Sequence, residues 1–168
     1  KQKTAYEMLR SLVGSEMCIR DRHGAMKVHA YDAGTNQLSW KIRSDSRVIS
    51  KEKLNCRYLT KKDIDDQIDL IVTDVSFISL TKILPAAYDV GSLNCSIITL
   101  IKPQFELSRD EVSKGGIVKD PELHQKSISK IVNYATSELQ LSHGGTINSP
   151  ITGSGGNIEF LAHFIKTS

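Results

Sequence analysis

Two short apolar runs constrain the fold of this 168-residue chain more than any other feature. Residues 70–72 (LIV) are followed by Asp74, and residues 95–101 (CSIITLI) are followed by Lys102. Both runs are rich in β-branched residues, and the segment 79–89 between them has helical spacing, so they predict two parallel strands joined by a helix. The carboxyl ends of such strands form the edge where open α/β sheets bind ligands. We therefore expect Asp74 and Lys102 on one rim of a sheet.

The connecting segment 79–89 carries recognisable helix signals. Ser79 or Thr81 can cap its start, and Gly91 can end it. Pro85 lies inside it and removes one backbone hydrogen bond, so we expect the helix to be divided in two pieces.

A further strand is expected at Lys27–Tyr31, ending at Asp32, and another at Val48–Ser50. The segment Gln37–Asp45 predicts a short helix with a partly buried Trp40. A carboxylate after a strand can accept hydrogen bonds from both hydroxyls of a ribose. Asp before Gly is also common in plain turns, and the residues alone leave the two interpretations of Asp32 about equally open.

The second half of the chain predicts a loop, a helix and a closing strand pair. Residues 103–119 are polar with balanced charge, which indicates a long loop, and a substrate-side flap is favoured because long loops in compact domains are often functional. A helix should follow from Asp120-Pro121 to about Leu139. Residues 146–151 and 158–164 predict an antiparallel pair around the loop 153–157 (GSGGN), with Glu159 at the start of the last strand. A hairpin explains this loop better than a phosphate-binding loop, because no Lys-Ser/Thr pair and no helix follow it.

Charge is unevenly distributed along the chain. The net charge is +3, but residues 41–62 hold eight Lys or Arg against two acidic residues, a local balance of +6. Clustered basic side chains attract phosphate and release counterions, which is the electrostatic signature of RNA binding. A solvated surface explains the same charges about as well.

Several classes of protein are disfavoured. No metalloprotease, serine-hydrolase or paired Cys/His motif occurs, so no metal is expected. The three cysteines, Cys18, Cys56 and Cys95, are odd in number and widely spaced, which indicates reduced thiols. No run approaches the roughly 20 apolar residues that span a bilayer, and a cytoplasmic location is expected.

Residues 1–22 do not fit the pattern of the remainder. They begin without Met and show neither strand alternation nor a glycine-rich loop. We expect this stretch to be an assembly artefact outside the domain of residues 23–168.

Three motifs are long and distinctive: DVSFISLTKILPA (74–86), LIKPQFELSRDEVSKGGIVKDPELH (100–124) and SPITGSGGNIEFLAHF (149–164). They resemble the hemolysin A (TlyA) family of ribosomal-RNA 2′-O-methyltransferases, which have an FtsJ-like, Rossmann-like α/β fold. The resemblance runs from about His23 to Ile165. It implies a mostly parallel sheet with an antiparallel last strand, S-adenosyl-L-methionine as cofactor, and ribosomal RNA or a ribosomal subunit as partner.

The resemblance also implies roles for individual residues. Asp74, Lys102 and Glu159 match the catalytic set, whereas an earlier catalytic lysine of the family has no counterpart. The implied cofactor-binding residues are Asp32, Asn55, Cys56 and Asp74. The RNA-binding candidates Lys51, Lys53 and Arg57 come instead from the basic segment 41–62. The first strand and the donor loop of the family are expected to be missing.

Two functions therefore compete. The first is S-adenosylmethionine-dependent 2′-O-methylation of ribosomal RNA by the parent protein, with this chain impaired. The alternative is a non-catalytic RNA- or ribosome-binding remnant of a methyltransferase fold. Membrane lysis, which the hemolysin name suggests, has no support, because no strongly amphipathic basic segment occurs.

Overall fold

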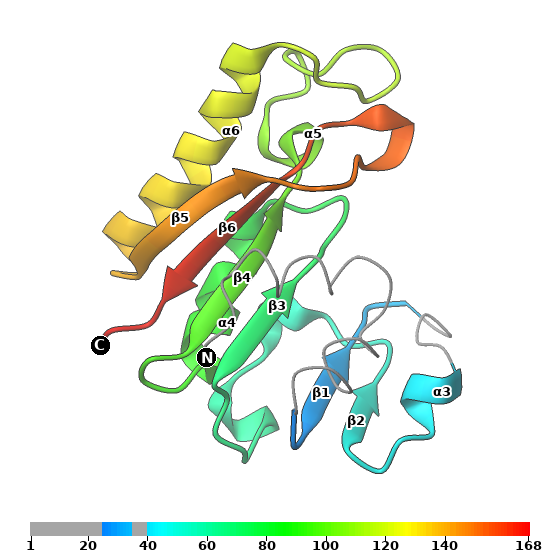
Figure 1. Ribbon diagram of the computed structural model, residues 1–168, viewed down its shortest axis with the longest axis vertical. Helices are drawn as coiled ribbons and strands as arrows, with labels where there is room; N and C mark the ends of the chain where they lie inside the picture. The colour runs from blue at the N-terminus through cyan, green and yellow to red at the C-terminus, as the bar shows by residue number, and fades with distance from the viewer. Residues whose placement is uncertain (1–24, 35–39) are drawn as a thin grey trace. The chain divides into compact units, whose positions relative to one another are not determined.

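The computed structural model describes residues 25–34 and 40–168 (Figure 1). The chain divides into two compact units, residues 1–56 and 57–168. The stretch 1–22 lies outside the described residues, so its predicted separation from the domain 23–168 stays a prediction.

The first unit contains two parallel strands, β1 (Val28–Tyr31) and β2 (Val48–Lys51). Val28 is paired with Val48, and Ala30 is buried. Both predicted strands are therefore confirmed.

The helix before β2 is shorter than expected. It covers only α3 (Trp40–Arg43), and residues 37–39 lie outside the description. Trp40 was expected to be partly buried, but it is 77% exposed, so that prediction is wrong. A single helical turn has no apolar stripe that could bury a side chain at its first position.

The second unit is built on a four-stranded sheet in the order β3-β4-β6-β5. Strands β3 and β4 are parallel, and β6 is antiparallel to both β4 and β5. Three strands thus run in one direction and the last strand runs in the other, as predicted. The bounds are β3 (Leu70–Thr73), β4 (Ser96–Ile101), β5 (Ser142–Asn148) and β6 (Phe160–Ile165).

Strand β3 is less buried than its apolar sequence suggests. Leu70 and Val72 are 37% and 40% exposed, whereas Ile71 packs against the core. Among the described residues β3 pairs with β4 alone, so it is an edge strand of the second unit. A short apolar run of this kind predicts a buried strand, and for β3 that prediction is wrong on one of its faces.

The β3–β4 connection is divided as the proline predicted. A 3-10 turn (Leu80–Lys82) precedes α4 (Leu84–Val90), and Pro85 lies in the first turn of α4. The hydroxyl of Ser79 accepts a hydrogen bond from the Thr81 backbone N–H. Gly91 follows the last residue of α4.

After β4 the chain is more ordered than a loop. A helical turn, α5 (Pro103–Glu106), begins immediately after Lys102. The prediction of an irregular segment from residue 103 is wrong here, because proline is well suited to the first position of a helix.

Helix α6 (Pro121–Asn133) begins where predicted, and the carboxylate of Asp120 accepts from the Glu122 N–H. A π-helical segment (Tyr134–Glu138) continues it, which agrees with the expected end near residue 139. Ile131 and Ala135 are fully buried against β4 and β6. Figure 1 shows α6 (yellow) running along β5 and β6.

The closing strand pair is confirmed as antiparallel, with shifted bounds. Strand β5 begins at Ser142 rather than at residue 146, and β6 begins one residue after Glu159. The glycine loop contains a short turn, Ser154–Gly156, and residues 157–159 connect it to β6.

Candidate active site

The structure brings Asp74 and Lys102 together. Each follows the carboxyl end of one of two paired parallel strands, β3 and β4. Lys102 Nζ lies 2.6 Å from Asp74 Oδ1 and donates a hydrogen bond to Ser76 Oγ at 3.1 Å. The lysine side chain is only 12% exposed, whereas that of Asp74 is 66% exposed. The amine of a mostly buried lysine side chain is thus held by two groups of the turn that follows β3.

Glu159 lies close enough to this pair to feel both charges. It precedes β6 and is only 5% exposed. Burial raises the pKa of its carboxyl, the charge of Lys102 lowers it, and the charge of Asp74 raises it. A hydrogen bond from Gln104 lowers the same pKa further. The three predicted catalytic residues therefore form one electrostatically coupled group.

An exposed aromatic residue stands beside this group. Phe77 is 91% exposed and adopts a positive φ of 62°, which is rare for a bulky residue. Its ring lies 5.0 Å from that of Phe105, on the turn that follows β4. Such strain concentrates at functional sites. Sequence reasoning missed Phe77, because no glycine or asparagine marks the turn.

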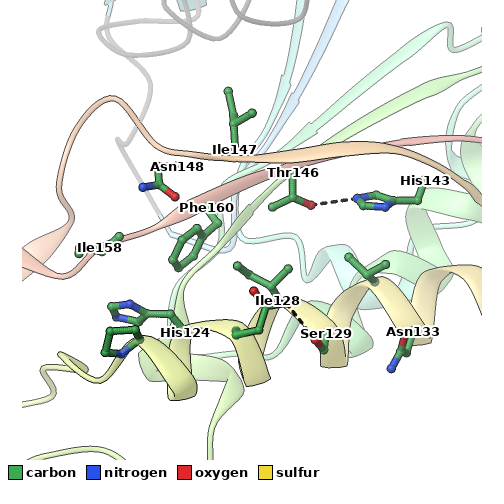
Figure 2. Close-up of a pocket in the computed structure, with 13 residues that line it drawn as sticks. His124, Ile128, Ser129, Asn133, His143, Thr146, Ile147, Asn148, Ile158 and Phe160 are labelled. Carbon is green, nitrogen blue, oxygen red and sulfur yellow. Dashed lines mark hydrogen bonds between the residues drawn. The ribbon is translucent and has the colours of Figure 1, made fainter.

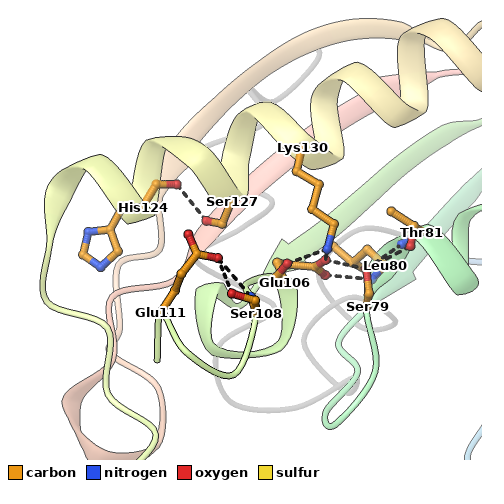
Figure 3. A network of polar contacts seen from close by, with 9 residues as sticks. All are labelled: Ser79, Leu80, Thr81, Glu106, Ser108, Glu111, His124, Ser127 and Lys130. Atoms are coloured by element: carbon orange, nitrogen blue, oxygen red, sulfur yellow. Dashed lines mark hydrogen bonds and ion pairs between the residues drawn. The ribbon is translucent and has the colours of Figure 1, made fainter. Parts of the chain in front are cut away.

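A second missed residue is Glu106, which ties the two turns together (Figure 3). It is only 4% exposed, and its carboxylate accepts hydrogen bonds from Ser79 Oγ at 2.5 Å and from the Leu80 N–H at 2.7 Å. Lys130 Nζ of α6 lies 3.4 Å from the same carboxylate. One feature of the sequence could have indicated Glu106: it lies four residues after Lys102, on the helical turn that begins there.

Three of the four residues expected to bind the cofactor, Asp32, Asn55 and Cys56, lie in the first unit, whereas the fourth, Asp74, lies in the second. Asp32 Oδ1 accepts from the Gly34 N–H at 2.6 Å, and the Leu54 N–H donates to the Asp32 backbone oxygen at 3.0 Å. Asn55 is exposed and Cys56 is half-buried. Burial raises the pKa of the Cys56 thiol, and the negative charge of Asp32 raises it further.

The three basic residues expected to bind RNA are all exposed. Lys51 lies over the Tyr31 ring, with Nζ 5.5 Å from its centroid. Arg57 lies over the Tyr58 ring at 5.2 Å and donates to its hydroxyl. Lys53 follows β2 with a positive φ of 57°. Two of these cations thus lie over tyrosine rings.

A pocket of about 720 Å³ opens elsewhere in the second unit, between α6 and β5 (Figure 2). His124, Ile128 and His143 are among its lining residues, but Asp74, Lys102 and Glu159 are not. His124 is buried on α6, and its Nε2 lies 2.9 Å from the Val118 carbonyl oxygen. The pocket is therefore separate from the group of three residues.

Two further observations concern the described residues. They contain no cluster of three or more His, Cys, Asp or Glu that could hold a metal ion. None of their helices is both long enough and apolar enough to cross a membrane.

Comparison with known proteins supplies the family. The model of the FtsJ-like methyltransferases matches residues 15–166, beginning before the expected boundary at residue 23. Hemolysin A of Brachyspira hyodysenteriae is 49% identical over 150 residues, which cover 86% of this chain and 60% of that protein. The 16S/23S rRNA (cytidine-2′-O)-methyltransferase TlyA of Mycobacterium tuberculosis (strain ATCC 25618 / H37Rv) is 42% identical over 138 residues, covering 82% of this chain and 51% of that protein.

A solved structure agrees with these relatives. A putative hemolysin from Lactococcus lactis superposes with a TM-score of 0.85 at 44% identity, covering 89% of this chain and 72% of that one. The chain spans between half and three-fifths of the length of the two relatives named above. The resemblance that the three sequence motifs carry is confirmed, and the chain belongs to the FtsJ-like methyltransferase family.

Proposed function

We propose that the protein transfers a methyl group from S-adenosyl-L-methionine to a ribose 2′-hydroxyl of ribosomal RNA. The observation that carries the proposal is the position of Lys102, held by Asp74 and Ser76 at the carboxyl ends of two parallel strands. Membership of the methyltransferase family supports this reaction class. The Mycobacterium tuberculosis relative is named as an rRNA (cytidine-2′-O)-methyltransferase, which is the same chemistry.

Lys102 is the residue that we assign to the acceptor hydroxyl. A hydroxyl becomes a better nucleophile when a positioned group accepts its proton, an effect of roughly a hundred- to ten-thousand-fold in rate. Asp74 and Ser76 fix the amine, which limits the orientations it can take. Glu159 adds a third group that is buried and coupled to the charge of the amine. In this proposal Lys102 first gives up its own proton, because an ammonium cannot accept one; the neutral amine then takes the proton of the hydroxyl, and the two carboxylates orient it.

The residues of the first unit fit part of the cofactor. Among the described residues, only the Gly34 N–H donates to the Asp32 carboxylate, so acceptor capacity remains for ribose hydroxyls. Asn55 and Cys56 follow β2 and offer polar groups to an adenine. When bound, S-adenosyl-L-methionine supplies the methyl group.

An RNA substrate is supported by two features of the surface. Phe77 presents an almost fully exposed ring beside Lys102, and unstacked RNA bases commonly stack on such rings. Lys51, Lys53 and Arg57 are exposed cations in the basic segment.

Reversing these three cations to Glu should weaken RNA binding and reduce its salt dependence. Unchanged binding would show that they are only a solvated surface.

The alternative function is RNA or ribosome binding without catalysis. Formation of methylated ribosomal RNA distinguishes the proposed function from it. The assay measures transfer of radiolabelled methyl groups to ribosomal RNA by the chain itself and by the chain joined to the part of a relative that it does not match. Label in alkali-resistant dinucleotides supports the proposal, because a 2′-O-methyl group blocks alkaline cleavage of the adjacent bond. RNA binding with no label in either protein would support the alternative, and label on a base would contradict 2′-O-transfer.

A further inference from the structure

The glycine loop before β6 holds a close approach that the proposed function does not explain. The Cα of Gly153 faces the side chain of Glu159. A Cβ added at Gly153 would lie 2.0 Å from Glu159 Oε1 and 2.5 Å from its carboxyl carbon. Real Cβ atoms essentially never show contacts below 3.0 Å. Any residue other than glycine must therefore displace either the loop or the carboxylate.

The loop is firmly held, so the carboxylate is the group that must move. The Gly153 N–H donates to the Asn157 carbonyl at 2.8 Å, and the Gly153 carbonyl accepts from the Gly156 N–H at 3.0 Å. Asn157 is only 3% exposed, and its side chain accepts from the Val118 N–H and donates to the Gly116 carbonyl, both at 2.9 Å. These bonds fix Gly153 from both sides of its backbone.

Backbone conformation does not explain why position 153 is a glycine. Gly153 has φ −77° and ψ −171°, an extended conformation that alanine adopts without strain. Gly155 and Gly156 in the same loop differ, because both have a positive φ. The distinctive constraint at position 153 is thus the space that the Glu159 carboxylate occupies.

We propose that Gly153 is a positioning residue. Because it has no side chain, the Glu159 carboxylate can occupy its buried place near Lys102. The catalytic meaning of this role rests on the proposed function. The geometric claim does not, since it concerns only Gly153, Asn157 and Glu159.

The first test is a double-mutant cycle on the stability of the full chain. Gly153→Ala should raise the unfolding equilibrium constant at least about tenfold when residue 159 is Glu. In a Glu159→Asp background the same change should raise the unfolding equilibrium constant less than about threefold, because the shorter side chain withdraws the carboxylate. Thr152→Ala and Ser154→Ala, at exposed neighbouring positions, serve as controls with little effect.

The second test follows the carboxylate itself. Carbon-13 NMR titration of Glu159 should show its pKa falling toward the ordinary value in Gly153→Ala, as the group moves out of its buried place. The proposal would be overturned if Gly153→Ala changed the unfolding equilibrium constant equally in both backgrounds, or if the titration of Glu159 were unchanged. Failure to fold in both backgrounds would also overturn it, whereas folding only with Glu159→Asp would support it.

Activity gives an independent third readout. In the chain joined to the unmatched part of a relative, Gly153→Ala should lower kcat roughly a hundredfold with KM for RNA nearly unchanged, because a displacement of about 1 Å can have that effect. A rise in KM alone would contradict a positioning role. If the unsubstituted protein transfers no methyl group, the proposed function fails, while the stability cycle and the titration still decide the geometric claim.

Discussion

Replacing Glu106 with alanine should destabilise the protein strongly. The carboxylate is buried and accepts from the Ser79 hydroxyl and from the buried Leu80 N–H. A hydrogen bond to a charged group contributes about 1.5–3 kcal/mol, and a buried donor left without a partner costs about 1–3 kcal/mol. Lys130 is 44% exposed, so its ion pair adds less than about 1 kcal/mol.

These contributions overlap, and we expect Glu106→Ala to lower the free energy of unfolding by about 3–5 kcal/mol. Glu106→Gln keeps an oxygen for the Leu80 N–H but loses the charge, so about 1–2 kcal/mol is expected. Urea unfolding of the full chain, followed by circular dichroism, measures both. Glu138→Ala is the matched control, since Glu138 is an exposed glutamate at the end of the π-helical segment that continues α6.

Two results would refute this reasoning. If Glu106→Ala and Glu138→Ala had equal unfolding midpoints, the network would not contribute to stability. If Glu106→Gln were as harmful as Glu106→Ala, the ionic charge rather than the hydrogen bond to Leu80 would dominate.

Two further predictions concern titrating groups. The pKa of Glu159 is raised in the folded protein, so ionisation of this carboxyl opposes folding. The stability that the protonated carboxyl gives below about pH 4.5 is lost as the pH rises through the native pKa. Glu159→Gln should therefore gain stability relative to the unsubstituted protein between about pH 4 and about pH 7 in urea titrations, and a difference that is constant with pH would contradict the sign. Removing the Asp32 charge should lower the pKa of the Cys56 thiol, so Asp32→Asn should accelerate its modification by a disulfide reagent in a Cys18→Ser background. Cys95 should stay unreactive in the same experiment, because it is fully buried and its pKa is raised to about 11. An unchanged rate at Cys56 would show that the Asp32 charge does not act on its thiol.

Local patterns predicted most elements of the fold. The β-branched runs before Asp74 and Lys102 became paired parallel strands, and Pro85 divided the connecting helix. Asp120-Pro121 opened α6, because a capping side chain and a residue without an N–H satisfy the start of a helix locally. Each of these outcomes depends on neighbours in sequence.

Features that depend on long-range contacts were not predictable in the same way. The exposure of Trp40 and of one face of β3 depends on what packs against them, which the pattern of apolar residues does not specify. Glu106 looks like an ordinary polar residue after a strand, yet its partners Ser79 and Leu80 lie 27 and 26 positions away.

In the candidate site, too, features set by neighbours in sequence were predictable and features set by long-range contacts were not. The strand ends placed Asp74 and Lys102 together, and motif similarity assigned Glu159 to the same group. Phe77 and the contact between Gly153 and Glu159 became visible only in three dimensions.

The central claim is that Lys102 acts on the acceptor hydroxyl. The measurement that tests it most directly is methyl transfer to ribosomal RNA by Lys102 variants of the chain joined to the unmatched part of a relative, with donor affinity measured by calorimetry on the same proteins. Lys102→Ala should reduce transfer at least about a hundredfold with donor affinity nearly unchanged. Lys102→Arg should be nearly as inactive, because a guanidinium stays protonated and cannot accept a proton. An active Arg variant would contradict proton transfer to Lys102, and an active Ala variant would contradict any catalytic role for it.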